Sequence, residues 1–149
     1  MSRTDLTKGR YSESNQEYFV TFVCHNRINL FSDDKLAKIF CQMIANNEDK
    51  YDCLWLTWVL MPDHFHGLLR LGTQGSLSKV VKQLKGNSAR QLNLEISQTN
   101  SIWQQGFFDR ALRKTEDRKG IARYIVANPL RKKIVRHVGD YPYWNSVYL

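Results

Sequence analysis

Residues 53–71 constrain the fold more than any other part of the chain. Residues 53–60 (CLWLTWVL) predict a nearly all-apolar β-strand, and residues 64–71 (HFHGLLRL) predict the returning strand of a hairpin. Since strand side chains alternate between faces, His64 and His66 point the same way, and Phe65 points into the opposite layer. Two neutral imidazoles on one face can bind a divalent metal ion, although a His-x-His pair alone is weak evidence.

The composition is that of one folded domain. The chain has 149 residues, of which 42% are hydrophobic, enough for a sizeable core. The longest apolar run, residues 54–61, is far shorter than the roughly 20 residues that span a bilayer. Cys24, Cys41 and Cys53 are scattered and form no Cys-x-x-Cys pair, as expected for thiols in a reducing compartment. We therefore expect a cytoplasmic protein with no membrane contact.

Positive charge is concentrated in two segments. The formal net charge is +8, and residues 110–136 contain ten basic and two acidic residues. A solvated surface would mix both signs, whereas a site for a polyanion concentrates one, so we favour nucleic acid over solubility or anionic lipid as the explanation. The residues that we expect to contact DNA are Lys79, Lys82, Lys85, Arg90, Arg110, Arg113, Lys114, Arg123, Arg131 and Lys132.

The remaining elements follow from periodicity and from helix-capping residues. We expect strands at 17–24, 102–104 and 107–113, and helices from 32–34 to about 47, from 77 to about 94, and from 115–117 to the residue before Pro129. The order β-α-β-β-α-β plus a terminal helix predicts an α+β fold, a ferredoxin-like (RRM-like) sandwich. In it an antiparallel sheet carries helices on one face, and a C-terminal helix carries Tyr124.

One domain over residues 1–149 is expected, with 1–14 as a flexible N-terminal segment and 136–149 as a C-terminal extension. Trp103, Phe107 and Phe108 fit either the core or a base-stacking surface, and we favour the core.

Tyr124 and Asn128 supply the groups that the His-x-His pair lacks. They are four residues apart on the last predicted helix, so their side chains should lie on one face. A phenol is a poor nucleophile at its free pKa of about 10, but a neighbouring cation favours the phenolate. An asparagine oxygen is an acceptable ligand for Mg²⁺ or Mn²⁺. Singly, Tyr124 fits a packing residue and Asn128 a helix terminator, and only the combination indicates a site.

Three motifs together are similar to a known family. His-Phe-His after an apolar strand, W-Q-x-G-F-x-D-R-x-L-R from Trp103, and Y-I-x-x-N-P-x-R from Tyr124 resemble the single-tyrosine HUH transposases. The subgroup is the one associated with repetitive extragenic palindromic (REP) elements in bacteria. The resemblance runs from about Tyr18 to Val135. After Asn128-Pro129 the subgroup usually has Arg-Ala-Gly, whereas this chain has Arg131-Lys132-Lys133.

The resemblance implies a role for each matching residue. His64, His66 and Asn128 would hold Mg²⁺ or Mn²⁺, and Tyr124 would form a 5′-phosphotyrosine with single-stranded DNA, leaving a free 3′-hydroxyl. The expected partners are single-stranded DNA and DNA hairpins, and the expected location is the bacterial nucleoid. Both a monomer and a homodimer are compatible with the sequence.

Two other functions are possible from the sequence. A non-catalytic nucleic-acid-binding protein would use the same basic surface, but it would have no need of the four site residues. A zinc hydrolase would require a further His, Cys or carboxylate ligand, and Cys53 belongs to an apolar run. We rank the zinc hydrolase last.

Overall fold

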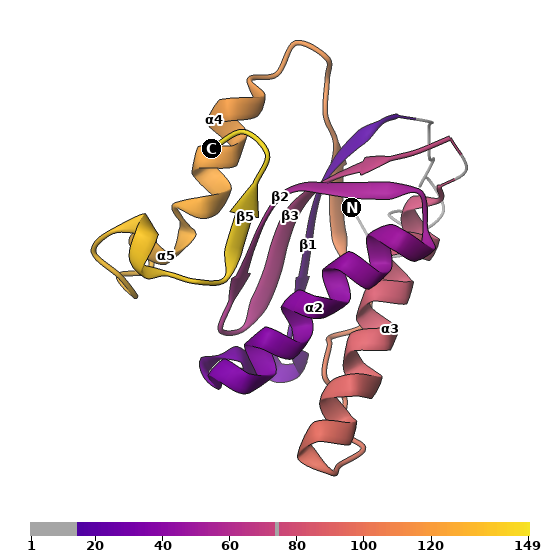
Figure 1. Cartoon of the computed structure of the whole chain (residues 1–149), viewed down its shortest axis with the longest axis vertical. Helices are drawn as coiled ribbons and strands as arrows, with labels where there is room; N and C mark the ends of the chain where they lie inside the picture. Colours follow the sequence, from indigo (N-terminus) through magenta and orange to yellow (C-terminus); the bar gives the residue numbers. More distant parts are fainter. Residues whose placement is uncertain (1–14, 74) are drawn as a thin grey trace.

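The chain folds around one five-stranded antiparallel sheet (Figure 1). This structure, a computed structural model, describes residues 15–73 and 75–149, and the predicted flexible segment 1–14 lies outside the described residues. The elements are β1 (Glu17–Val23), the 3-10 turns η1 (His25–Arg27) and η2 (Leu30–Ser32), α2 (Asp34–Lys50), β2 (Cys53–Met61), β3 (His64–Leu71), α3 (Leu77–Ile96), β4 (Phe108–Ala111), α4 (Arg118–Val126), α5 (Asn128–Arg131), the 3-10 turn η3 (Val138–Asp140) and β5 (Trp144–Ser146). The strand order is β4-β1-β3-β2-β5. The predicted β-α-β-β-α-β order is confirmed.

The hairpin has the register that the sequence predicts. Met61 pairs with His64, so Pro62 and Asp63 form the turn, and β3 lies between β1 and β2 in the sheet. A β-bulge between Trp55 and Thr57 changes the alternation of β2. As a result Trp55 and Trp58, three residues apart, pack into the same core layer.

Helices cover both faces of the sheet (Figure 1). The larger core lies between one face and the pair α2 and α3, and it includes Phe65 and Leu69. On the other face Leu68 packs in a second apolar cluster with Ile125 of α4. Both α2 and α3 therefore lie on one face, as predicted, and the helix that carries Tyr124 covers the histidine face.

Each long helix begins at a capping residue. The carboxylate of Asp33 accepts from the backbone N–H groups of Lys35 and Leu36, and that of Asp117 accepts from Gly120. The hydroxyl of Ser76 does the same at the start of α3. These caps satisfy backbone donors that have no partner inside the helix.

Two local expectations were wrong, and the C-terminal segment contains a further strand. The helix before Pro129 already ends at Val126, and Asn128–Arg131 forms the separate helix α5 with Pro129 in its first turn, where proline is tolerated. The strand expected at 107–113 is only Phe108–Ala111, and 102–104 forms a single bridge, Cys24 with Trp103. Part of the expected C-terminal extension is β5, which pairs with β2 at an edge of the sheet.

Candidate active site

His66 is a half-buried imidazole on the histidine face of β3. Its Nδ1 lies 3.1 Å from Thr21 Oγ1, and its ring packs edge-on against Phe19 at a centroid distance of 4.2 Å. Burial, and to a lesser degree the charges of His64 and Arg131, lowers the pKa of His66 to about 4. Its Nε2 is buried and has no hydrogen-bond partner among residues 15–73 and 75–149. A neutral imidazole nitrogen without a hydrogen-bond partner is suited to bind a metal ion.

His64 also has an oxygen at Nδ1, but its Nε2, unlike that of His66, lies near a partner. Its Nδ1 lies 2.7 Å from Asp63 Oδ1, and its Nε2 lies 3.3 Å from Asn128 Nδ2. Both imidazoles thus have an oxygen at Nδ1, which favours the tautomer whose Nε2 can bind a metal. Asp63 is the group that orients His64, and it also pairs with Arg27 at 3.4 Å.

Asn128 completes a small polar group on the histidine face. It is 8% exposed, and its amide points at His64. The oxygen and nitrogen of the Asn128 amide are similar in size, so a half-turn of the amide presents Oδ1 to the same place. His64, His66 and Asn128 therefore fit a hard divalent cation whose other positions are taken by water or phosphate.

A zinc site built from conventional ligands finds no support. Within 15–73 and 75–149, no three His, Cys, Asp or Glu side chains are grouped closely enough to hold a metal. Cys53 Sγ lies 3.8 Å from Asn47 O, on the α2 side of the sheet, and burial raises the pKa of its thiol to about 12.

Tyr124 lies on α4, the helix that covers the histidine face. It is 56% exposed, and the helix break at Ala127 separates it from α5. Tyr124 and Asn128 therefore belong to two successive helices, and the single helix that the sequence predicts for them is wrong. Tyr124 lines a pocket of about 390 Å³ together with Phe19 and Arg110. Since Phe19 also contacts His66, the tyrosine pocket adjoins the histidine pair.

The expected DNA-contacting residues fall into two groups. Arg110, Arg123 and Arg131 lie on β4, α4 and α5, and the guanidinium of Arg110 is paired with Glu116 at 2.9 Å. Lys79, Lys82, Lys85 and Arg90 lie on α3, which packs on the opposite face of the sheet.

The two groups therefore do not lie together around the histidines. For Arg113, Lys114 and Lys132, DNA contact stays a prediction. Lys85 was expected to face solvent or ligand. It is instead half-buried, and its ammonium donates to the backbone oxygens of Gln104 and Gly106.

Sequence reasoning missed two supporting residues, Phe19 and Thr21. Their alternation along β1 places them on one face, but only the pairing of Thr21 with His66 shows that this face is the histidine face. Of the three aromatic residues at 103–108, Trp103 is in the core, Phe107 packs against it, and Phe108 is exposed.

Comparisons with known proteins identify the family of this chain and its fold. A family model described as "Transposase IS200 like" matches residues 12–128. A Haemophilus influenzae protein assigned as a REP-associated tyrosine transposase is 28% identical over 151 residues, covering 95% of this chain and 82% of its own length. The REP-associated tyrosine transposase of Escherichia coli is 29% identical over 87 residues, 58% of this chain and 50% of that protein.

Two solved structures share the fold. The structure of a REP-associated tyrosine transposase bound to a REP hairpin has a TM-score of 0.76 at 24% identity, covering 91% of this chain and 79% of that one. A transposase structure from Deinococcus radiodurans has a TM-score of 0.53 at 19% identity, covering 87% of this chain and 94% of that one. No helix in the described part of this chain is long and apolar enough to cross a membrane.

Proposed function

The chain belongs to the IS200-like transposase family, and from this premise we propose that it cuts and rejoins single-stranded DNA through Tyr124. The observation that carries the proposal is the pair of imidazoles whose Nδ1 atoms are each engaged by oxygen, with the buried Nε2 of His66 left open on the face that α4 covers.

The proposed reaction is an in-line exchange at phosphorus. The Tyr124 oxygen forms a bond to the phosphorus, the bond to the 3′-oxygen breaks, the phenol loses its proton, and the 3′-oxygen gains one. His64, His66 and Asn128 would hold Mg²⁺ or Mn²⁺, which when bound polarises the phosphate. Reversal of the step with another 3′-hydroxyl would join two strands.

We propose a DNA hairpin with a flanking single strand as the substrate. A structural relative is bound to a REP hairpin, and the two curated relatives have REP-associated names. The excess of eight positive charges in residues 110–136 supports binding to a phosphate backbone. Activity on such DNA would occur at the bacterial nucleoid.

Covalent trapping tests the proposal. The protein is incubated with end-labelled hairpin oligonucleotides and Mn²⁺ or Mg²⁺, then separated in denaturant. We expect a protein–DNA adduct that Tyr124→Phe abolishes while DNA binding persists, and that the matched control Tyr148→Phe retains. An adduct formed by Tyr124→Phe would refute the assignment of the nucleophile, and binding without cleavage by the wild type would favour a non-catalytic DNA-binding protein.

A further inference from the structure

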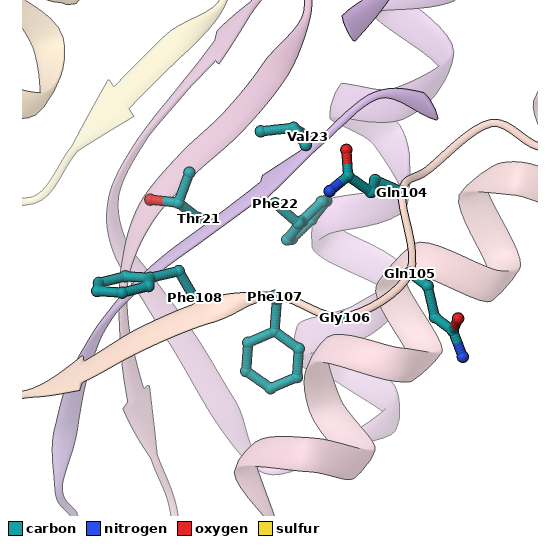
Figure 2. A pocket seen from close by; sticks show the side chains of 8 residues that line it. All are labelled: Thr21, Phe22, Val23, Gln104, Gln105, Gly106, Phe107 and Phe108. Carbon is teal, nitrogen blue, oxygen red and sulfur yellow. The ribbon is translucent and has the colours of Figure 1, made fainter. Parts of the chain in front are cut away.

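A second pocket lies at the edge of the sheet, between β1 and the chain that leads into β4. It has a volume of about 280 Å³, and its lining includes Thr21, Gln104 and Phe108 (Figure 2). The pocket lies between two contacts with β1, the pairing of Phe108 with Thr21 and the hydrogen bond of Gln104 with Val23, and residues 105–107 connect the two. A volume at the lower limit of ligand pockets suits a single flat ring system.

The chain that forms this pocket is held in place from several sides. Trp103 is buried and donates through Nε1 to Ser88 Oγ at 3.0 Å, and the backbone N–H of Gln104 donates to Val23 O at 2.9 Å. Gly106 has a φ of 85°, a conformation that strongly favours glycine. Lys85 donates to the oxygens of Gln104 and Gly106. The pocket is therefore preformed, which reduces the ordering cost of binding.

Phe108 presents an exposed aromatic ring at this pocket. It is 59% exposed, whereas its neighbour Phe107 packs against the core. Figure 2 shows the two rings pointing in different directions, with the Gln104 amide directed toward β1 and the Gln105 amide directed away from it. An exposed ring beside an amide offers a base both a stacking surface and a hydrogen-bonding group.

The pocket adjoins the candidate active site. Phe108 pairs directly with Thr21, and Thr21 Oγ1 contacts His66 Nδ1 at 3.1 Å. On the same two strands, Arg110 pairs with Phe19 two residues away from Phe108 and Thr21. Both Arg110 and Phe19 line the pocket of Tyr124. Along β1 and β4 the tyrosine pocket is therefore at Phe19 and Arg110, and the Phe108 pocket begins two residues farther on, at Thr21 and Phe108.

We propose that the Phe108 pocket receives the unpaired nucleobase immediately 5′ of the cleaved bond. The inference rests on the proposed function. In an in-line displacement the leaving 3′-oxygen is opposite the attacking tyrosine, so the nucleotide that keeps this oxygen lies on the side away from Tyr124. Phe108 stacks on its base, and Gln104 contacts the base edge.

The test combines a protein substitution with a DNA lesion. Binding is measured with Tyr124→Phe protein and with a hairpin oligonucleotide that carries either a normal or an abasic nucleotide immediately 5′ of the cleaved bond. Phe108→Ala should weaken binding of normal DNA about 5- to 100-fold, the effect of losing one base–aromatic stack. Phe108→Trp should restore it, and Leu94→Ala, an exposed apolar residue on α3, should have no effect.

Non-additivity identifies the contact. With abasic DNA, Phe108→Ala should cause no further loss, because the partner of the ring is already missing. Full additivity, or equal binding by Phe108→Ala and its parent, would overturn the inference. The proposed function is judged separately by the wild-type adduct: if the adduct forms while Phe108→Ala binds normally, only this inference fails. If no adduct forms, no cleaved bond exists to define the position of the base, and the proposed function and this inference fail together.

Discussion

The guanidinium of Arg131 lies over the ring of Tyr124, with Arg131 Cζ 4.0 Å from the ring centroid. The same guanidinium donates through Nη1 to the backbone oxygen of Tyr124 at 2.7 Å. Arg131 therefore joins α5 to α4 across the helix break at Ala127 and restricts the orientation of the phenol. Because Arg131 also contributes to the lowered pKa of His66, its positive charge acts on the nucleophile side and the histidine side together.

Arg131→Ala should slow adduct formation at saturating DNA more than it weakens DNA binding. Loss of the contact frees the ring, and misplacement of a reacting group can cost on the order of 10²-fold in rate. Arg131→Lys should recover little, since an ammonium lacks the planar surface and fork of a guanidinium. Rates from rapid quench and affinities from filter binding separate the two effects. A change confined to affinity would mean that Arg131 only contacts DNA.

Thr21→Val should weaken Mn²⁺ binding about 10- to 100-fold, the usual effect of removing a group that orients a ligating histidine. The substitution preserves shape and removes the oxygen at His66 Nδ1. Titration calorimetry with Mn²⁺ measures the affinity. The matched control is Thr57→Val, because Thr57 bonds Ser146 instead of a histidine. Equal affinities for Thr21→Val and the wild type would contradict the proposed orientation.

Mn²⁺ should stabilise the wild-type protein but not His66→Ala. A ligand present at 100 times its dissociation constant adds about 2.7 kcal/mol to the free energy of unfolding, and a chelator should reverse the gain. Thermal unfolding with and without Mn²⁺ measures it. His25→Ala, at an exposed histidine outside the site, should respond like the wild type. A similar gain in His66→Ala would place the metal elsewhere.

Lys85→Met should lower the free energy of unfolding by about 1–3 kcal/mol, since two backbone oxygens lose a charged donor. Lys82→Met, at an exposed lysine on the same helix, should change it by less than about 0.5 kcal/mol. Urea unfolding compares the two variants. If both behave alike, Lys85 does not hold the 104–107 segment in place.

Asn47→Ala should be among the most destabilising polar substitutions. Asn47 is fully buried, its Nδ2 donates to Val80 O at 2.9 Å, and its Oδ1 accepts from Trp55 Nε1 at 2.9 Å. Leaving these groups unpaired costs about 1–3 kcal/mol each. Urea unfolding of Asn47→Ala and of the exposed neighbour Asn46→Ala should differ clearly. Equal stability would mean that the Asn47 network contributes little.

Local signals predicted most of the fold. The apolar run 53–60, the turn at Pro62 and the alternation of 64–71 specify the hairpin, and the capping residues Asp33 and Asp117 mark two helix starts. β5 escaped prediction because Trp144–Ser146 is only three residues long, too short to show a period. The contact of Lys85 with the backbone oxygens of Gln104 and Gly106 was not predicted either. Periodicity shows which residues lie outside the apolar face of a helix, but not which loop the helix packs against.

The chemistry of the candidate site was determined by residue types and short spacings. His64 and His66 share a face because strand geometry requires it, and Tyr124 and Asn128 supply a phenol and an amide one turn apart. Tertiary structure alone decided the surroundings of these groups: Thr21 and Asp63 at the two Nδ1 atoms, Arg131 on the tyrosine ring, and the α3 lysines on the opposite face. The physical reason is that alternation and helical period act within one element, whereas strand register and the packing of helices on a sheet depend on contacts between residues far apart in the chain.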